Sequence, residues 1–520
     1  MKILGIDLGT TNSAVALVNQ HGVPEIIANR EGEYITPSVI FFDGGEAVVG
    51  RVAKHSAGLD PQNTVQNVKR EMGSKSWRFY PSAGGEYSAE AISALILRRL
   101  REDAETIRGE EFTHAVISVP AYFADPERQA TQDAAELAGL TPVRIINEPT
   151  AAALAFGLES SSTEDRIAVY DLGGGTFDVS ILKITPGDVE VLGTGGDRGL
   201  GGVDWDNAII EWIDEQYVAG GGQTMLDEDS DPSLLADLRD KAETAKHTLS
   251  QMRQTKIVLS MGPSHQTITL TRDTFEEITS ELLGRTETRM EIVLEEAGLR
   301  WPDITKVLLV GGSTKMPAVT EMLSRVTGLT PSREVHPDEA VALGAAVQAA
   351  LVAKTMPPSK TSGKGSSATG VPEETGIKEV NITDVTAHSL GVVVLDKQGQ
   401  PYNQIVIDRG TQLPTRNEVT TYAYSENQTY WAMKLTQGED REIRFVKVIG
   451  EGEIQYDTPK PRGYPILLRV SYDHDGLIHA HVFDGNTRAP FGELHITRDS
   501  NLSQDELDQM KRNVSGLTLG

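Results

Sequence analysis

The chain has 520 residues, which at about 150 residues per domain predicts roughly three to four domains. Its 75 acidic residues outnumber the 48 lysines and arginines, and the net charge of −27 disfavours nucleic acid as a partner. Cysteine is absent and no apolar run reaches about 18 residues, which excludes disulfides, thiol catalysis and membrane spans, so we expect a soluble cytoplasmic protein without a membrane partner.

A glycine-rich turn follows the first predicted strand. Residues 3–17 read as an apolar strand ending in Asp-Leu-Gly, then a glycine and threonine turn, then a return strand, and residues 167–181 repeat this design. Asp7 and Asp171 occupy the same place in the two copies. The long spacing between the copies predicts two homologous lobes whose loops face each other.

These loops have the chemistry of phosphate-binding turns. Glycines let backbone N–H groups approach phosphate oxygens, threonine hydroxyls add donors, and a carboxylate at the strand end can hold Mg²⁺ or its waters. A single Asp-Leu-Gly turn is better explained as a tight hairpin, but two copies favour a phosphate site. A third strand and glycine turn at 307–317 is explained equally well by a structural turn when it is taken alone, but with the other two it suggests a loop that meets the sugar or base of a nucleotide.

Amphipathic helices alternate with these strands. Residues 89–107 carry an apolar stripe, residues 125–139 are bracketed by Asp125 as N-cap and by Gly139 after the last turn, and a further helix is predicted at about 234–252. Glycine-punctuated strands that alternate with such helices are typical of an α/β architecture.

The composition changes in the last third of the chain. Residues 355–378 contain no aromatic residue and little to bury, which predicts a flexible linker. Beyond them the sequence alternates with period two, placing Trp431 and Met433 on one face, and is typical of antiparallel β-structure. A short helix is predicted at 502–513.

Six sequence blocks resemble the Hsp70 chaperone family, whose ATPase domain has the two-lobe actin-like fold. The blocks are 6–13, 119–123, 146–155, 171–179, 200–204 and 337–348. The similarity is strong over residues 1–352 and weaker from 384 to the C-terminus. On these motifs the chain is identified as a member of a divergent side branch of this family.

The resemblance implies an α/β fold class: a duplicated actin-like two-lobe ATPase domain, a flexible linker, and an antiparallel β-sandwich substrate-binding domain. The expected boundaries are 1–354 for the nucleotide-binding domain, 355–383 for the linker and interdomain connector, 384–500 for the β-sandwich, and 501–520 for a short remnant of the lid helix. Because most of that lid is missing, we expect client trapping to be fast and leaky.

The implied function is that of an ATP-dependent chaperone. ATP binding and slow hydrolysis would regulate the binding of unfolded or extended polypeptide clients, with ATP or ADP, Mg²⁺ and K⁺ bound. The implied partners are a J-domain cochaperone and a nucleotide exchange factor. Two alternatives stay open: an ATP-binding scaffold or cochaperone with one dedicated partner, and a sugar-kinase-like phosphotransferase, which would need an acceptor pocket that no motif announces.

The resemblance also implies roles for individual residues. Asp7 and Asp171 would organise Mg²⁺ and flanking K⁺, while Lys69 would reach the γ-phosphate region. Glu148 and Asp178 would orient water, although without the family Lys69 fits a solvated surface lysine and Glu148 fits a helix N-terminal acid. The phosphate contacts would be Gly9, Thr10, Thr11, Asn12, Gly174, Gly175 and Thr176, the last also catalytic. The other nucleotide contacts would be Gly201, Gly202, Glu243, Lys246, His247, Ser250, Gly311, Gly312, Ser313, Lys315 and Asp338.

Two of these positions depart from the family pattern. His247 and Lys315 stand where the best-known members have the two arginines that sandwich the adenine. Lysine lacks the planar guanidinium that stacks on a ring, so we expect lower nucleotide affinity and altered base selectivity.

A second group of positions concerns coupling between the domains. Pro120 and Arg128 match the family's relay between nucleotide and domain interface, and Arg144 matches a residue that meets the J-domain cochaperone. The connector at 380–384 has about half the usual apolar side chains, so we expect weaker docking of the β-domain.

The peptide pocket of the β-domain is also expected to differ. Trp431 occupies the position of a small β-branched pocket residue, with Met433 beside it on the same face. Leu395 and Tyr424 fall where the family encloses the peptide with an arch. A tryptophan buried in the β-sandwich core is the alternative explanation for Trp431.

Overall fold

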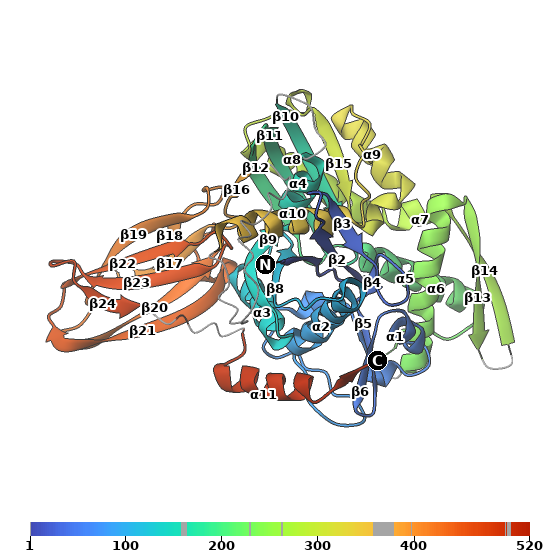
Figure 1. Ribbon diagram of the computed structural model, residues 1–520, viewed down its shortest axis with the longest axis horizontal. Coiled ribbons are helices and arrows are strands. Elements are labelled where there is room, and N and C mark those ends of the chain that lie inside the picture. Colours follow the sequence, from blue (N-terminus) through green and yellow to red (C-terminus); the bar gives the residue numbers. More distant parts are fainter. Residues whose placement is uncertain are drawn as a thin grey trace, which may run out of the picture.

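The computed structural model describes residues 2–157, 164–227, 230–261, 264–356, 379–396, 398–493, 496 and 501–520. This part of the chain forms a two-lobe α/β body with an elongated β-sandwich attached to one side (Figure 1). Apart from its first two residues, the linker predicted at 355–378 lies outside the described residues.

The sheet of lobe I is built around the first glycine-rich turn. Its strands are β1 (Leu4–Asp7), β2 (Asn12–Val18), β3 (Pro24–Ile27), β4 (Thr36–Pro37), β8 (His114–Val119) and β9 (Thr141–Asn147). β1 and β2 form an antiparallel hairpin, and β8 and β9 continue parallel to β1. The first Asp-Leu-Gly turn therefore lies at the carboxyl edge of a mixed sheet, where parallel strands commonly present ligand-binding groups.

The sheet of lobe II repeats this arrangement. Its strands are β10 (Asp165–Leu172), β11 (Phe177–Thr185), β12 (Asp188–Asp197), β15 (Lys306–Val310) and β16 (Asn381–Thr383). β10 and β11 form the antiparallel hairpin, and β15 runs parallel to β10. The duplication predicted from the two Asp-Leu-Gly motifs is thus present in the sheet topology.

Two helices join the sheets into one body. α4 (Glu148–Gly157) and α10 (Ala340–Thr355) share a buried cluster with strands of both lobes. A Cβ on Gly344 of α10 would lie 1.7 Å from the carbonyl oxygen of Ala151. Glycine is therefore required where these helices cross.

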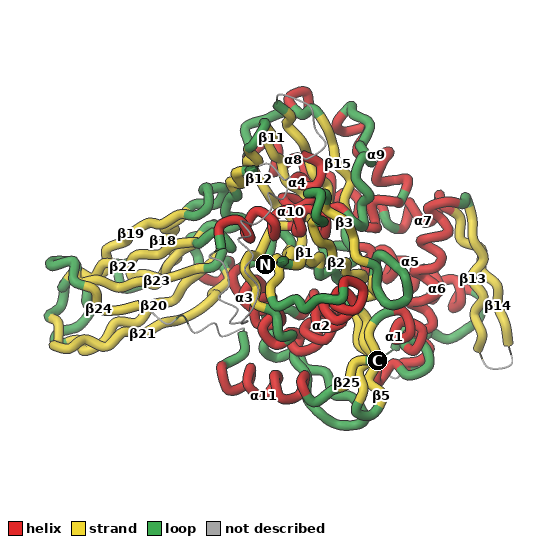
Figure 2. The backbone as a smooth tube through the Cα atoms, in the orientation of Figure 1, coloured by secondary structure: helices red, strands yellow, loops and turns green. Residues whose placement is uncertain are grey.

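The outer faces of the lobes carry the remaining helices and two small sheets (Figure 2). Around lobe I lie β5 (Val39–Asp43), β6 (Glu46–Val49), β7 (Thr64–Gln66), α1 (Arg51–Ser56), α2 (Ala89–Arg108), α3 (Asp125–Leu137) and the 3₁₀ turns Pro61–Asn63 and Val68–Glu71. Around lobe II lie α5 (Gly202–Ala219), α6 (Pro232–Gln251), β13 (Gln254–Met261), β14 (Ser264–Thr271), α7 (Arg272–Ile278), α8 (Ser280–Glu296), α9 (Pro317–Thr327) and the 3₁₀ turns Trp301–Asp303 and Gly312–Lys315.

The helices predicted from apolar periodicity are found close to their expected ranges, but the predicted cap of α3 is wrong. Ala124 is the N-cap, and Asp125 is the first helical residue. Its carboxylate instead accepts a hydrogen bond of 2.8 Å from the backbone N–H of Ile478, in the β-sandwich. The acid that resembles a local cap therefore bonds another part of the chain.

The β-sandwich consists of two four-stranded antiparallel sheets, as the period-two pattern predicted. One contains β17 (Leu390–Leu395), β18 (Pro401–Ile407), β20 (Gln428–Gln437) and β21 (Lys447–Lys460). The other contains β19 (Thr415–Tyr422), β22 (Pro465–Tyr472), β23 (Ile478–Asp484) and β24 (Pro490–Glu493), and a 3₁₀ turn spans Ile443–Phe445. One apolar cluster fills the space between the sheets.

The connector joins the sandwich to lobe II as an edge strand. β16 pairs in parallel with β12, and Val380 and Ile382 pack against the lobe II core, as their shared face predicts. Asn381 points to solvent. Arg409 adds a hydrogen bond of 2.9 Å to the carbonyl of Thr194.

The C-terminal segment packs on lobe I. α11 (Gln504–Ser515) lies against α2 and α3, and β25 (Thr518–Leu519) pairs in parallel with β6. Met510 and Val514 belong to the lobe I core cluster. The predicted short helix is therefore present, and it lies on lobe I, below the attachment of the sandwich in the view of Figure 1. Its descent from a lid helix stays a prediction.

Candidate functional site

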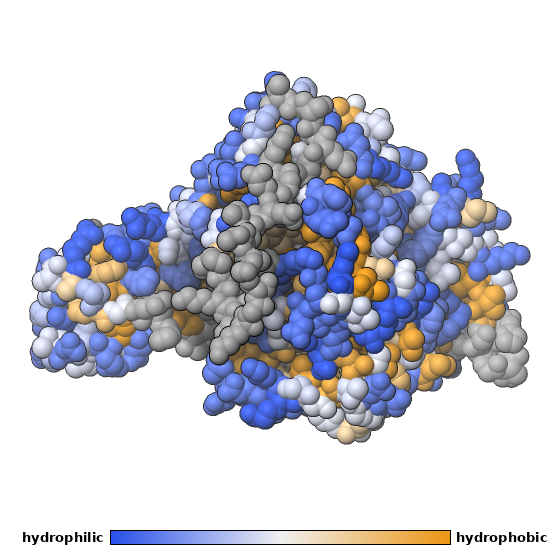
Figure 3. Space-filling view, viewed as in Figure 1, coloured by the Kyte–Doolittle hydropathy of each residue, from blue (hydrophilic) through white to orange (hydrophobic). Residues whose placement is uncertain are grey.

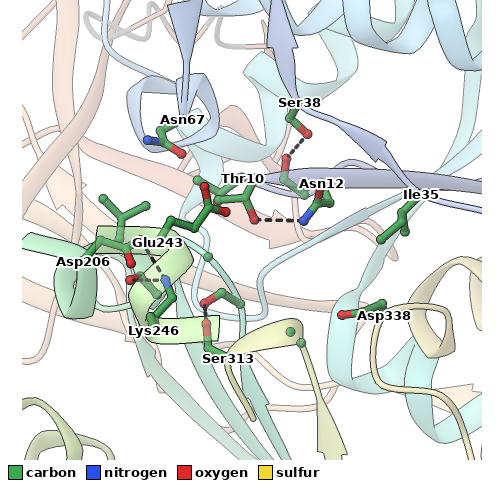
Figure 4. A pocket seen from close by; sticks show the side chains of 18 of the residues that line it. Thr10, Asn12, Ile35, Ser38, Asn67, Asp206, Glu243, Lys246, Ser313 and Asp338 are labelled. Atoms are coloured by element: carbon green, nitrogen blue, oxygen red, sulfur yellow. Dashed lines mark hydrogen bonds and ion pairs between the residues drawn. The ribbon is translucent and has the colours of Figure 1, made fainter. Parts of the chain in front are cut away.

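A deep cavity of about 860 Å³ lies between the lobes (Figure 4). Its walls come from both halves of the chain: the turns after β1, β10 and β15, together with α1 and α6. Polar side chains dominate the close view of the cavity. The face of the molecule drawn in Figure 3 carries many hydrophilic residues, with hydrophobic patches between them.

The two glycine-rich turns touch at the base of this cavity, as their duplication predicted. A Cβ on Gly174 would lie 2.4 Å from the side chain of Thr11, and one on Gly175 would lie 2.5 Å from Thr10. A Cβ on Gly201 would in turn lie 2.5 Å from the backbone of Gly175. Only glycine permits this contact, which places backbone N–H groups and threonine hydroxyls of both lobes around one small volume.

Buried acids surround one lysine beside these turns. Lys69 Nζ lies 2.5 Å from Glu148 Oε1, and both side chains are buried. Ser118 donates a hydrogen bond of 3.0 Å to Asp7, and the backbone N–H of Tyr122 donates one of 2.9 Å to Asp178. Together with Asp171, four carboxyl groups therefore share one ammonium group.

This imbalance appears in the protonation of the cluster. Burial and the charge of Glu148 raise the pKa of Asp7 and of Asp178 to about 7, and burial with Glu148 raises the pKa of Asp171 well above its usual value. Burial lowers the pKa of Lys69, but Glu148 and Asp7 outweigh it and the net direction is upward. The lysine thus stays charged among acids that lack enough positive charge.

The chemistry of this cluster suits Mg²⁺. Carboxylate oxygens are suitable ligands for this hard cation, and the excess of acid over Lys69 is the charge that a divalent cation would neutralise. Within the described residues, no three histidine, cysteine or acidic side chains are close enough to form a complete cage. The residues therefore fit an ion that keeps water and phosphate ligands beside Asp7 and Asp171.

The raised pKa values predict that the nucleotide-free protein loses stability as pH rises. Between about pH 4 and 7 the folded state holds protons on Asp7 and Asp178 that the unfolded chain releases, so the free energy of unfolding falls through this window. The slope is on the order of 1 kcal/mol per pH unit for each carboxyl. Thermal unfolding at pH 5.5 and 7.5 measures it.

Asp178→Asn is the control for that measurement because it removes one of the two titrating groups. The variant should lose part of the difference between the two pH values, which isolates this site from other acids. A wild-type protein that is more stable at pH 7.5 than at pH 5.5, with Asp178→Asn showing the same change, would contradict the assignment.

The side of the cavity that faces α6 is held by ion pairs. Glu243 pairs with Lys54 of lobe I at 2.8 Å, and Lys246 pairs with Asp206 at 2.7 Å while donating to the carbonyl of Gly202 at 2.8 Å. Burial lowers the pKa of His247, which favours a neutral ring there. A neutral imidazole offers a flat face without the charge of an arginine.

The third glycine turn carries the other departure from the family pattern. Lys315 pairs with Asp338 at 2.5 Å, across the mouth of the cavity. Gly311 has φ +82°, and a Cβ there would lie 2.4 Å from the carbonyl of Leu172. The turn after β15 therefore packs directly on the end of β10, next to the second glycine-rich turn.

Most of the predicted nucleotide residues line this one cavity. The exceptions are Gly175, Gly201 and Asp178, which lie directly behind the lining residues. The predicted residues in the lining are Asp7, Gly9, Thr10, Thr11, Asn12, Lys69, Glu148, Asp171, Gly174, Thr176, Gly202, Glu243, Lys246, His247, Ser250, Gly311, Gly312, Ser313, Lys315 and Asp338.

Arg70 is the main residue that sequence reasoning missed. Its guanidinium donates to the carbonyl of Gly175 at 2.9 Å and to Asp204 at 2.5 Å, so it ties lobe I to the lobe II loop. Its place next to Lys69 was the available signal. The partner, however, lies 134 positions away and could not be inferred from local sequence.

The predicted coupling residues lie where the β-sandwich meets lobe I. Arg128 is buried and donates to Asn147 at 2.7 Å and to the carbonyl of Asp475 at 3.1 Å, in the sandwich. Asn147 also donates to Asp384 at 2.7 Å, at the end of the connector.

The other two coupling residues are in the same region. Arg144 lies 3.6 Å from the carboxylate of Asp475, and Pro120 is buried at the end of β8.

The four predicted peptide-binding residues fall into two pairs. Trp431 and Met433 are 6% and 5% exposed and belong to the sandwich core. Leu395 and Tyr424 are 48% and 65% exposed. The structure thus places the indole between the sheets, which is the core alternative for Trp431, and it leaves the two arch positions available on the surface.

Two lobes with facing phosphate-type loops, joined to a β-sandwich, define a two-lobe ATPase-type protein with a β-rich domain. The family model described as "Hsp70 protein" matches residues 3–79 and 74–517. The chain therefore belongs to the Hsp70 family, whose members are ATPases that generally bind ATP or ADP with Mg²⁺, client polypeptides, J-domain cochaperones and exchange factors. None of the helices in the described ranges is long and apolar enough to span a bilayer.

Proposed function

We propose that this chain is an ATP-dependent chaperone in which ATP binding and slow hydrolysis regulate client binding by the β-sandwich. The observation that carries the proposal is the contact between the two glycine-rich turns at the base of one interlobe cavity, beside the Lys69 and carboxylate cluster. Phosphoryl transfer depends mainly on positioning and on neutralising charge, and this arrangement supplies both. The proposal includes a cytoplasmic location.

Each group has a distinct part in the proposed hydrolysis. Backbone N–H groups and the hydroxyls of Thr10, Thr11 and Thr176 hold phosphate oxygens, and Lys69 adds positive charge near the terminal phosphate. Asp7 and Asp171 would hold Mg²⁺ and K⁺, and the metal would supply neutralisation of phosphate charge. Glu148 and Asp178 help to orient the attacking water or the water on the metal.

Two acids of the site lie within a few contacts of the β-sandwich, which supports coupling. Asp178 accepts the backbone N–H of Tyr122, whose ring lies 4.3 Å from the ring of His388. Glu148 follows Asn147, which bonds Asp384 of the connector. A change in the charge or position of either acid can therefore alter docking through few intermediates.

The decisive experiment is the affinity for a panel of unfolded and Leu-rich peptides in ATP and in ADP. We expect the dissociation constants to differ at least about tenfold, which corresponds to ~1.4 kcal/mol of coupling. Equal affinity in both nucleotides, for peptides that do bind, would overturn the proposed regulation.

A scaffold with one dedicated partner is the second candidate function. The exposed side chains of Leu395 and Tyr424 favour it, because two large apolar groups on the surface of the sandwich can serve one fitted partner surface. If no peptide of the panel binds in either nucleotide while ATP still changes sandwich docking, this second function is supported.

A further inference from the structure

One buried carboxylate lies where three parts of the chain meet. Glu127 is in the first turn of α3 in lobe I, and its side chain is only 3% exposed. The loop after β12, from lobe II, and β21 of the β-sandwich both reach it. No motif in the sequence marks this position, and the site described above does not use it.

The partners of Glu127 come from the other two parts. Its Oε1 accepts from Arg198 Nη1 of lobe II and, at 3.0 Å, from Lys447 Nζ of the sandwich. Its Oε2 is buried without a hydrogen-bond partner among the described residues. A buried carboxylate is costly unless it is paired, so this pairing is complete only when lobe I, lobe II and the sandwich are assembled.

Arg198 lies in a loop that packs against the second glycine-rich turn, directly behind the lining of the cavity. The preceding Asp197 is held by Arg285 at 2.5 Å and by the backbone N–H of Gly199 at 2.9 Å. Three residues later, Gly201 packs on Gly175 of the second phosphate-type loop. A shift of this loop with the bound nucleotide therefore moves the cation that Glu127 holds.

We propose that Glu127 forms an ionic junction, meaning that its carboxylate holds Arg198 of lobe II and Lys447 of the sandwich at one point. Docking of the β-sandwich then depends on the position of the lobe II loop that carries Arg198. This inference rests on the proposed function. The Glu127 carboxylate lies between two cations and offsets part of their mutual repulsion. When the lobe II loop withdraws Arg198, the carboxylate pairs with Lys447 alone. Without the carboxylate, Arg198 and Lys447 face each other as like charges and oppose docking.

Docking has other supports, so a variant at this position should still fold. Arg128, Asp384 and Asp475 hold the sandwich through separate hydrogen bonds. Arg198 and Lys447 are 49% and 40% exposed, so water screens their attraction and the effect is moderate. Sandwich docking should therefore weaken without being lost.

The test is energy transfer between two dyes on the full chain. The sequence has no cysteine, so Glu211→Cys on α5 and Glu426→Cys in the sandwich give specific labelling. In ATP, Glu127→Gln should lower the docking equilibrium constant at least about fivefold. Glu136→Gln, an exposed acid on the same helix, is the matched control and should leave it unchanged.

A second variant separates an electrostatic junction from a merely structural role. Adding Arg198→Met to Glu127→Gln removes one of the two facing cations, so docking should return to within about twofold of wild type. Docking that stays weak in the double variant, or that Glu127→Gln does not change, overturns the junction. These comparisons are made at fixed nucleotide, so they do not depend on whether wild type responds to ATP.

The response of wild type to nucleotide tests the proposed function separately. If the energy transfer of the wild-type chain is the same in ATP and in ADP, although calorimetry shows that both bind, the proposed regulation fails. The comparison of Glu127→Gln with the double variant still decides the junction in that case.

Discussion

Replacing Lys69 by alanine is expected to lower the single-turnover rate of ATP hydrolysis at least about tenfold, or ~1.4 kcal/mol of barrier. Lys69 is the ammonium group among Asp7, Glu148, Asp171 and Asp178, and it is buried against Glu148. Without it, these acids repel one another and also repel the phosphates. Rapid mixing of the variant with limiting labelled ATP measures the rate.

Lys75→Ala is the matched control for this measurement. Lys75 is a nearby lysine that is 45% exposed and pairs with Glu506 outside the cavity, so its loss should leave hydrolysis unchanged. Asp171→Asn should lower the rate by a similar factor to Lys69→Ala, because it removes a carboxylate expected to organise the metal. Wild-type turnover in both site variants would refute the roles given to this cluster.

The chemistry of the candidate site could be predicted because the same strand–turn–strand motif occurs twice in the sequence. The Asp-Leu-Gly turns at 7–9 and 171–173 have matching strands before and after them, and a duplicated motif constrains the fold far more than a single one does. The helices could be predicted from apolar periodicity because that signal is local: it is contained in a few consecutive turns of the chain.

Contacts between distant segments could not be predicted in this way. Two ion pairs join the lobes: Arg70 with Asp204, and Lys54 with Glu243. In the sequence each of these side chains resembles an ordinary surface charge, because its partner lies in the other lobe. Asp125 shows the same limit more sharply. Its sequence context is that of a helix cap, yet a backbone N–H from the β-sandwich competes for the carboxylate.

Trp431 lies between these two cases. Period-two alternation correctly predicts that its side chain points inward with Met433, because parity is a local property of a strand. Whether an inward side chain lines a pocket or fills a core depends on the opposite sheet. In the structure the indole is 6% exposed and belongs to the apolar cluster that both sheets share, with Ile454 beside it on β21 of its own sheet.

Trp431→Val is therefore expected to destabilise the β-sandwich by about 2–4 kcal/mol, because the smaller side chain loses apolar contacts and leaves a cavity. The change should appear as a lower midpoint for the sandwich transition in denaturant, with the transition of the lobes unchanged. Met433→Ala is the matched variant, since this neighbour on the same strand is equally buried and its truncation should also lower the stability of the sandwich. Wild-type stability in Trp431→Val would show that the indole is not part of the core.

The same cavity predicts a gain in peptide binding if it is reached from the surface near Leu395 and Tyr424. A leucine side chain that enters the vacated space regains the apolar contacts that the variant lost, so Leu-rich peptides should bind Trp431→Val at least about fivefold more tightly than wild type, or ~1 kcal/mol. Because binding then stabilises the folded state, peptide should also raise the unfolding midpoint of Trp431→Val more than that of wild type.

Met433→Ala should show the loss of stability without this gain in peptide affinity. A folded Trp431→Val variant with unchanged peptide affinity would mean that the indole is purely a core residue, and that client recognition belongs to exposed side chains on the outer surface of the sandwich.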